Sequence, residues 1–292
     1  KVEYDFSEAT TGALHLLVAN DHVRVNNSQE TEFAKVGDNS AYIWATAEHR
    51  WSEQLSGSAL LSYTNVDNDR DGTVEDPGQR SGFVHDHRSF NASNLKLELQ
   101  QGNDELLFQY GLELGLLSAH YSYASSLDVA AGEPFPDSPP SLTVREATLQ
   151  PDGSQQAAFV SGRWRMTDRL TTELGMRWDN QTWDRVDGGT QLSPRLNLRY
   201  DPDARTQLRA SWGRFYQAQG INELQLEDGI QTFFPAQRAD HLILSAEHAL
   251  VNHIRVRLEA YYKDYEELKP RFENQFDPLV LIPGLQTDLI EV

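Results

Sequence analysis

The sequence contains no cysteine. This absence excludes disulfides, cysteine-bound zinc and thiol catalysis together. The sequence also lacks any run approaching the ~20 apolar residues that a membrane-spanning helix needs, and its mean hydropathy is −0.58. These features exclude a helical membrane protein. They do not exclude a membrane β-barrel, because the strands of a barrel are apolar on one face only.

Positive charge is scarce. The 292 residues include 25 Lys and Arg against 44 Asp and Glu, which gives a formal net charge of −19. Binding to a nucleic-acid backbone requires a basic surface, so we expect no nucleic-acid partner. The chain opens at Lys1 without a signal peptide and ends at Val292 inside an apolar stretch. We therefore expect a piece of a longer protein, whose targeting signals cannot be observed in these residues.

The dominant pattern in the sequence is alternation with a period of two residues. Residues 93–100 give the clearest case, with leucines at 95, 97 and 99 and polar side chains between them. Such alternation predicts a strand with one apolar and one polar face. We count about twelve such segments, most of them near the ~9–11 residues that span a bilayer at a steep tilt. No segment with helical spacing competes, so we expect a single all-β domain.

The connections between these segments alternate between short and long. We predict short turns at residues 8–12, 52–53, 101–104, 167–169, 201–205 and 250–253, and long polar loops at 20–39, 65–87, 125–154, 183–190 and 218–238. Short periplasmic turns and long extracellular loops are typical of outer-membrane barrels, whereas Greek-key sandwiches have no reason to alternate in this way. A phase slip near Leu116 and Leu117 predicts a bulge.

The polar face of the predicted strands is too charged for a packed core. Ten charged side chains lie opposite the leucines: Arg163, Arg165, Glu173, Arg177, Arg195, Arg199, Arg209, Arg255, Arg257 and Glu259. This face meets solvent in a soluble sheet protein and lines a wet lumen in a wide barrel. Aromatic residues near the strand ends, such as Trp51 and Trp178, favour the barrel, because barrels carry interfacial aromatic girdles. We therefore predict an antiparallel transmembrane β-barrel.

Four segments resemble the central barrel of TonB-dependent outer-membrane receptors. Residues 192–200 (LSPRLNLRY) and 208–218 (LRASWGRFYQA) are similar to two consecutive strands of that family. Residues 234–247 resemble its Pro-Glu segment, although Gln237 replaces the usual Glu and the later Gly is missing. Residues 260–265 (AYYKDY) resemble a further strand. The resemblance covers residues 191–265, and the remaining chain agrees in pattern.

The resemblance implies a fold, a function and a set of partners. The family's barrel has 22 strands and encloses a plug, so residues 1–292 are expected to form about half of a barrel domain, with the plug and the C-terminal strands elsewhere. The implied function is uptake of a bulky, scarce nutrient such as a siderophore, cobalamin or a glycan. The implied partners are the ligand, membrane lipid and the energy-coupling protein TonB, reached through the plug. We expect a monomer in the Gram-negative outer membrane.

Two other interpretations remain open on the sequence. A passive outer-membrane porin has the same strand pattern. A soluble, extracellular β-rich binding protein has the same alternation with a core in place of lipid. The sequence contains no Gly-x-Ser-x-Gly, phosphate-binding or dinucleotide motif and no other catalytic constellation, so we do not expect an enzyme.

The candidate ligand contacts lie on the predicted lumen face and in the loops. They are the arginines Arg195, Arg199 and Arg209 and the aromatic residues Tyr216, Phe233 and Phe234. The alternative for the aromatic residues is packing of loop on loop. Residues 67–76 suggest a further site, because Asp67, Asp69 and Asp71 have the spacing of a calcium loop. The twelfth position is Gly78 in place of the expected Glu, and a solvated acidic loop is the alternative.

Overall fold

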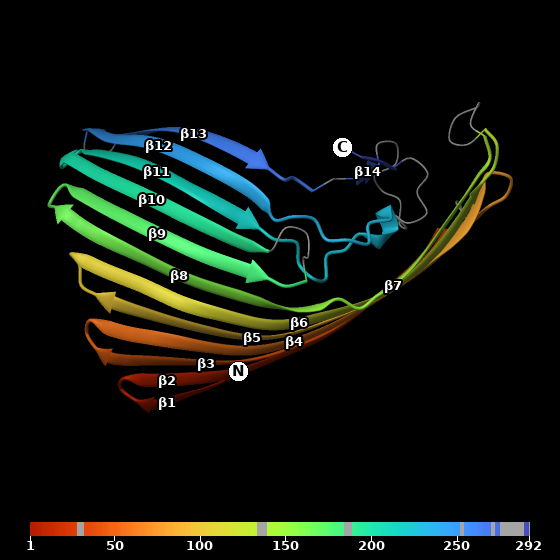
Figure 1. Cartoon of the computed structure of the whole chain (residues 1–292), viewed down its shortest axis with the longest axis horizontal. Helices are drawn as coiled ribbons and strands as arrows, with labels where there is room; N and C mark the ends of the chain where they lie inside the picture. The colour runs from red at the N-terminus through yellow and green to blue at the C-terminus, as the bar shows by residue number, and fades with distance from the viewer. Residues whose placement is uncertain are drawn as a thin grey trace.

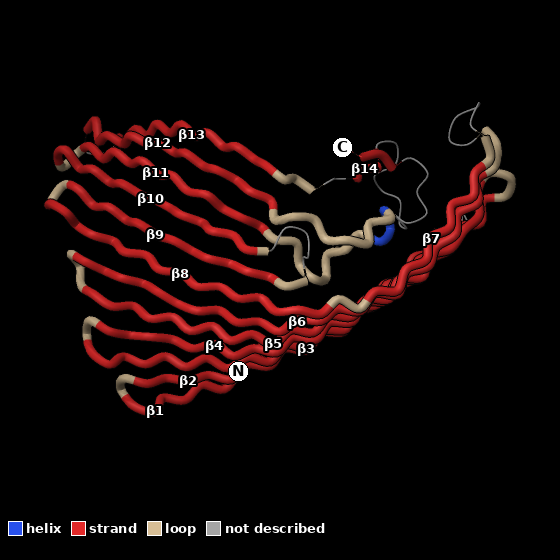
Figure 2. The backbone as a smooth tube through the Cα atoms, viewed as in Figure 1, coloured by secondary structure: helices blue, strands red, loops and turns tan. Residues whose placement is uncertain are grey.

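The computed structural model describes residues 1–27, 32–132, 139–183, 189–251, 254–269, 272–274 and 289–291. Strands dominate it (Figure 2). Thirteen strands form one curved antiparallel sheet (Figure 1). They are β1 (Val2–Ser7), β2 (Thr10–Asn27), β3 (Glu32–Ser52), β4 (Leu55–Asp76), β5 (Arg80–Gly102), β6 (Leu106–Val129), β7 (Ser141–Leu149), β8 (Asp152–Thr167), β9 (Leu170–Gln181), β10 (Thr190–Asp203), β11 (Thr206–Gln217), β12 (Gln237–Val251) and β13 (Ile254–Glu266).

The strands follow one another in space as they do in sequence. Each of β1 to β6 and of β8 to β13 pairs with its chain neighbour, β6 pairs with β8, and β7 pairs with the far end of β6. Two short strands, β14 (Phe272–Asn274) and β15 (Leu289–Glu291), pair with each other. The predicted all-β antiparallel class is confirmed, with thirteen strands in the sheet in place of about twelve. No helix in the described ranges is long and apolar enough to cross a membrane.

Strands β10 and β11 form the hairpin on which the family resemblance is strongest. Leu198 pairs with Ala210 and Arg199 with Arg209, so the predicted apolar and polar faces of the two strands match. The turn is narrower than predicted, because β10 continues to Asp203 past a register shift. The Asp203 carboxylate then accepts hydrogen bonds from the Arg205 amide at 2.7 Å and the Thr206 hydroxyl at 2.9 Å. These bonds satisfy the backbone where the ladder ends.

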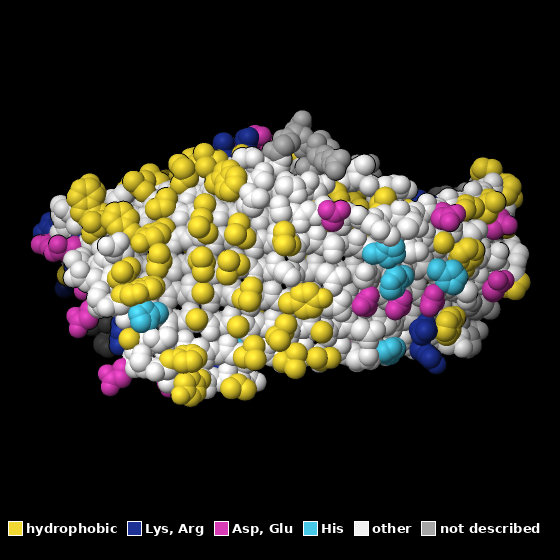
Figure 3. All heavy atoms as spheres, turned by 60° about the horizontal axis from the view of Figure 1, so that its bottom comes forward, with side chains coloured by type: hydrophobic (Ala, Val, Ile, Leu, Met, Phe, Trp, Pro, Cys, Tyr) yellow, Lys and Arg dark blue, Asp and Glu magenta, His cyan; other side chains and the backbone are white. Residues whose placement is uncertain are grey.

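The convex face of the sheet carries a broad belt of apolar side chains. Figure 3 shows this belt as yellow spheres spread over neighbouring strands. Its members include Leu61, Leu112, Leu116, Leu174 and Leu258, each more than half exposed. A contiguous exposed apolar surface of this extent is not tolerated in water on a soluble monomer. The belt therefore faces lipid, as the barrel prediction requires.

Strands β3 to β6 continue well beyond the belt. They contain 21, 22, 23 and 24 residues, about twice the ~9–11 that cross a bilayer. The predicted long loop at residues 65–87 is therefore wrong, because β4 and β5 stay paired as far as Asp76 and Arg80. The predicted loops at 20–39 and 125–154 are largely strand as well. Residues 28–31, 133–138, 184–188 and 252–253, which fall in predicted connections, lie outside the described residues.

The predicted bulge near Leu116 is also wrong. The register of β6 with β5 and with β8 runs through this point without a shift. What changes is the face that carries the apolar residues. Leu112, Leu114 and Leu116 are exposed on the convex face, whereas the buried apolar residues that follow occupy the alternate positions Ala119, Tyr121 and Tyr123 on the concave face. The alternation of apolar and polar residues shifts by one position here, because the apolar residues before this point face lipid and those after it face the buried interior.

The buried core lies on the concave side, above the level of the belt. The connection from β11 to β12, residues 218–236, folds onto this side of the sheet and contains the 3-10 helix η1 (Leu226–Asp228) (Figure 1). Ile221, Leu224 and Leu226 of this connection are at most 2% exposed. They belong to one cluster with inward residues of the sheet: Ala34, Val74, Val84, Ala119, Tyr121, Tyr123, Leu127 and Val129. We call the connection at residues 218–236 the inner loop.

Candidate functional site

The concave face at the level of the belt is polar and charged. Its centre holds an ionic network, in which Arg177 pairs with Glu113 and with Asp179 at 2.8 Å each. Lys96 lies 3.1 Å from Glu98 and 3.7 Å from Glu113. These groups come from β5, β6 and β9, and register places them on the side opposite Leu97 and Leu112. Paired charges of this kind fit a water-filled interior, so the predicted lumen face is a real surface of the sheet.

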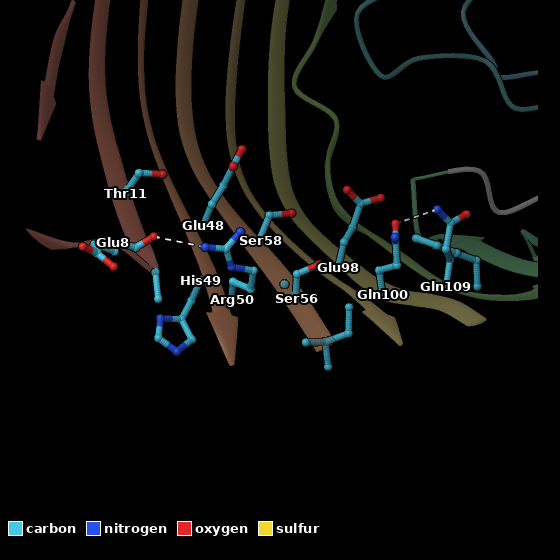
Figure 4. Close-up of a pocket in the computed structure, with 14 residues that line it drawn as sticks. Glu8, Thr11, Glu48, His49, Arg50, Ser56, Ser58, Glu98, Gln100 and Gln109 are labelled. Carbon is cyan, nitrogen blue, oxygen red and sulfur yellow. Dashed lines mark hydrogen bonds between the residues drawn. The ribbon is translucent and has the colours of Figure 1, made fainter. Parts of the chain in front are cut away.

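A hollow in this surface lies close to the turns that join the strands in pairs. Figure 4 shows its polar lining, with side chains of Glu48, Ser58 and Glu98 rising from neighbouring strands. Few direct bonds cross it. Arg50 donates to the Glu8 carbonyl at 3.4 Å, and the Gln109 amide donates to Gln100 at 3.2 Å. Two further lining groups bond outside the hollow's lining, since Glu98 lies 3.1 Å from Lys96 and His49 Nδ1 lies 2.7 Å from the Thr10 hydroxyl.

The three predicted lumen arginines share the concave face but differ in their partners. Arg199 donates to the Asp201 carboxylate at 2.9 Å. Arg195 and Arg209 make no hydrogen bond or ion pair with the described part of the chain. An arginine that carries five donors and no partner suits a planar anionic group such as a carboxylate. Arg199 is thus paired within the protein, whereas Arg195 and Arg209 have no hydrogen-bond or ion-pair partner among the described residues.

Glycines flank Arg195 on both sides. Register places Gly175 of β9 and Gly213 of β11 directly beside it. A Cβ atom added at Gly175 would lie 2.4 Å from Arg195 Nε, so the guanidinium side chain lies over this glycine. Arg195 also lines a second hollow, together with Lys96, Arg177 and Phe215. Gly175 thus gives the Arg195 side chain room to lie against the sheet, and the Phe215 ring occupies the space over Gly213, where an added Cβ would lie 3.0 Å from it.

The inner loop is held to the wall by polar contacts as well as by its apolar residues. Tyr121 Oη donates to the Ile221 carbonyl at 2.8 Å and accepts from the Leu224 amide at 3.2 Å. Arg88 lies 2.6 Å from Glu227 and donates to the Leu224 carbonyl at 3.1 Å. Buried backbone groups need such partners. The loop is therefore a docked part of the interior.

Both anchoring groups have altered proton affinity. Burial raises the pKa of Tyr121 to about 12, although the hydrogen bond from the Leu224 amide acts in the opposite direction. Burial acts to lower the pKa of Arg88, but its hydrogen bonds and charge contacts with Asp86 and Glu227 outweigh this and raise the pKa above its usual value. Tyr121 therefore stays neutral and Arg88 stays charged at any physiological pH.

The predicted aromatic contacts are placed differently from one another. Tyr216 shares the face of Trp212 in β11, which is the outward face, and Phe215 beside it is the inward residue. Phe233 packs against the buried cluster, as the loop-on-loop alternative expects. The Phe234 amide donates to Gln219 Oε1 at 2.9 Å. Tyr216 nevertheless lines the second hollow together with Arg195, whereas Phe233 and Phe234 belong to the inner loop.

The predicted calcium loop is wrong in its conformation. Asp67, Asp69 and Asp71 lie on β4, where register pairs the last two with His87 and His85 of β5. An extended strand holds alternate side chains in a row, so their carboxylates do not converge on one ion as they do in a calcium loop. Among the described residues, no group of three or more His, Asp or Glu side chains is arranged to hold a metal ion.

The sequence analysis missed the residues that dock the inner loop. Tyr121 lies in a predicted strand and Trp183 in a predicted loop, and the sequence gives neither of them, nor Arg88, a role in docking. Trp183 is 9% exposed, and its Nε1 donates to the Gln219 carbonyl at 3.1 Å. One signal for them was present. The alternation of Ala119, Tyr121 and Tyr123 continues the strand pattern of β6 with the apolar residues on the other face.

The sequence matches a protein family over most of its length. The match is to the family described as TonB dependent receptor-like, beta-barrel, and it spans residues 4–268. This family comprises outer-membrane receptors of Gram-negative bacteria, which are transporters and not enzymes. Among curated protein sequences, none matches the chain.

Solved structures share the fold at low sequence identity. The RagAB peptide importer matches with a TM-score of 0.60 and 10% identity, over 99% of this chain and 41% of its own. FpvA of P. aeruginosa, in complex with an iron-bound pyoverdine, gives 0.57 and 11%, over 99% and 44%. The ferric citrate transporter FecA gives 0.58 and 12%, over 96% and 44%. The chain thus spans less than half the length of each of these proteins. It belongs to the TonB-dependent receptor family and forms part of the family's β-barrel.

Proposed function

We propose that this chain is a wall segment of a receptor that takes up a bulky, scarce nutrient across the outer membrane. The observation that carries the proposal is the two-faced sheet, with an apolar belt for lipid on one side and a charged, water-lined surface on the other. The similar structures named above concern peptides, ferric citrate and an iron-bound siderophore. Two of the three concern an iron chelate, which supports a metal chelate as the cargo, whereas cobalamin and a glycan rest on the family resemblance.

The lumen arginines favour an anionic cargo within that class. Arg195 and Arg209 each present a guanidinium group without a hydrogen-bond or ion-pair partner in the described residues, and Arg195 lines the second hollow. Carboxylate or catecholate oxygens of a metal chelate would complete their hydrogen bonds. Arg199 contributes less, because Asp201 already engages it. We therefore propose Arg195 and Arg209 as the stronger contacts.

The driving force and the partners follow from the family. We propose that a plug closes the barrel, that TonB acts on this plug, and that the receptor works as a monomer. Capture of the ligand from outside would involve the inner loop, which covers the upper part of the interior. In a passive porin, the runner-up function, flux would not need TonB.

The test is uptake by the full-length receptor in a Gram-negative host with and without functional TonB. A radiolabelled ferric chelate carrying free carboxylates is the probe. The Arg195→Ala, Arg209→Ala double variant is expected to reduce uptake at least tenfold. Arg169→Ala, in the exposed turn after β8, removes one positive charge away from the lumen and is the control for each single substitution, Arg195→Ala and Arg209→Ala. Uptake that persists without TonB would favour the porin, and equal losses in Arg169→Ala and the single lumen variants would refute the arginine assignment.

A further inference from the structure

The outward face of the long strands carries a group of histidines above the apolar belt. Figure 3 shows histidine side chains gathered among acidic ones, beside the yellow belt. His85 and His87 of β5 lie on this face, and register places His120 of β6 diagonally next to His87. These strands are in the middle of the sheet, so strands added at either edge would not cover them. The group lies outside the lumen and plays no part in the proposed transport route.

Two of these histidines are oriented by carboxylates of the neighbouring strand. His87 Nδ1 lies 2.7 Å from Asp69 Oδ1, and His85 Nδ1 lies 2.8 Å from Asp71 Oδ1. A carboxylate only accepts hydrogen bonds, so Nδ1 is the donor and carries the proton. In a neutral imidazole the lone pair is then on Nε2. Histidines that bind metals are typically held by this kind of carboxylate contact through the other ring nitrogen.

His87 has a second imidazole within reach. The ring centroids of His87 and His120 are 6.1 Å apart. With a metal–nitrogen distance of about 2.0 Å, two imidazoles on one ion have centroids about 5–6 Å apart. A small side-chain adjustment therefore brings both Nε2 atoms onto one ion. The side chains of His87 and Asp69 are 45% and 52% exposed, so an ion can approach from outside.

We propose that His87 and His120 form a two-histidine site for a divalent transition metal on the outer surface of the barrel, with Asp69 as the positioning residue. Water molecules complete the coordination, which agrees with the absence of a three-residue cluster among the described residues. Imidazole ligands select Cu²⁺, Ni²⁺ or Zn²⁺ over Ca²⁺ or Mg²⁺. The row of Asp67, Asp69 and Asp71 adds negative charge beside the site, which favours a cation.

The chain contains its own control for this site. His85 has the same carboxylate contact as His87, but the residue across from it on β6 is Ala124. It therefore has the orientation of a ligand, but the residue diagonally next to it on β6 is Ser122, where His87 has His120. If orientation by a carboxylate alone were sufficient, His85 and His87 would contribute equally to metal binding. If two imidazoles are needed, only the pair of His87 and His120 contributes.

The experiment is calorimetric titration of the full-length receptor, in detergent, with Zn²⁺ and separately with Ca²⁺. We expect saturable Zn²⁺ binding and no Ca²⁺ binding. His87→Gln and His120→Gln should each weaken Zn²⁺ binding at least tenfold, Asp69→Asn should weaken it about 10–100-fold, and His85→Gln should change it less than threefold.

Electron paramagnetic resonance with Cu²⁺ provides the structural readout. Two imidazole nitrogens should couple to the copper in the wild type and one in His120→Gln. All four residues are surface groups, so the variants are expected to fold, and the β-sheet signal in circular dichroism checks this. No Zn²⁺ binding at millimolar concentration would overturn the proposal, and so would equal effects of His85→Gln and His120→Gln.

Discussion

A single charge placed in the apolar belt tests whether the two faces of the sheet are correctly assigned. Leu97 is 41% exposed on the convex face of β5. Its cross-strand neighbours are Ala59 on β4 and Leu112 on β6, so it lies in the middle of the belt. An arginine near the bilayer midplane of a barrel costs about 2–4 kcal/mol. Leu97→Arg should reduce the free energy of unfolding by that amount.

The matched substitution is one residue away on the opposite face. Lys96 points into the lumen, where it lies 3.1 Å from Glu98 and 3.7 Å from Glu113. Its side chain is 38% exposed, so water screens these pairs, and each contributes about 0–1 kcal/mol. Glu113 keeps its 2.8 Å contact with Arg177. Lys96→Leu should therefore cost less than about 1 kcal/mol.

The measurement is equilibrium unfolding in guanidinium chloride of the full-length receptor in lipid vesicles, followed by tryptophan fluorescence. Heat-modifiable migration of the extracted protein gives an independent measure of barrel assembly. A third variant, Ser118→Arg, places arginine on the outward face of β6 just beyond the belt and should cost about 0–1 kcal/mol. Equal losses for Leu97→Arg and Lys96→Leu would refute the assignment of the faces.

Three further predictions concern the interior. Tyr121→Phe removes the hydroxyl that contacts the inner loop twice and should speed proteolytic cleavage within residues 218–236 several-fold, with little change in cleavage at the turn between β8 and β9. Burial raises the pKa of Tyr121 to about 12, so the folded state favours the neutral phenol. Docking of the inner loop should therefore be intact below pH 10 and should weaken as the pH rises from about 10 to 12. Tyrosinate absorbance at 295 nm can follow this trend, and Tyr121→Phe should abolish it. Gly175→Val puts a side chain where Arg195 lies, since even a Cβ would be 2.4 Å from Nε, and should weaken chelate binding at least fivefold in a binding assay. Gly37→Ala, where an added Cβ would lie 3.7 Å from its nearest neighbour, should leave binding unchanged.

The strands that cross the membrane could be predicted well from the sequence. Leu95, Leu97 and Leu99 alternate with polar residues, and the structure places them on the convex face. The physical reason is simple. A strand between lipid and water must be apolar on one side and polar on the other, so its sequence reports both environments directly. The turns at 8–9, 53–54 and 168–169 were located for the same reason, because the alternation stops there.

The extracellular parts of the strands could not be predicted in this way. Val74 and Val84 are buried, but three of the four outward residues that flank them, Thr73, Glu75 and His85, are polar because they lie above the lipid. The apolar residues in the extracellular parts of the strands are therefore few and lie on the opposite face. A search for continued alternation on the lipid-facing side finds mostly polar residues there. The residues that hold the inner loop could not be predicted for a related reason. Contacts such as the one between Arg88 and Glu227 join residues 139 positions apart, which no local pattern reveals.

The change of face has a further consequence for how the interior is built. On β4 it falls between Tyr63 and Val66, and on β6 between Leu116 and Leu117. Below it, the inward side chains are charged and meet water. Above it, they include the buried apolar cluster and the paired charges of Arg88 and Asp86, and the inner loop packs against them. A wide barrel needs an apolar inner wall only where something packs against it, since uncovered apolar surface in a wet lumen is unfavourable. The level at which the apolar residues change faces thus marks both the outer limit of the lipid and the limit of the open lumen. Arg195 lies below this level, on the wall that faces the ligand. Tyr121 lies above it, on the wall that holds the inner loop.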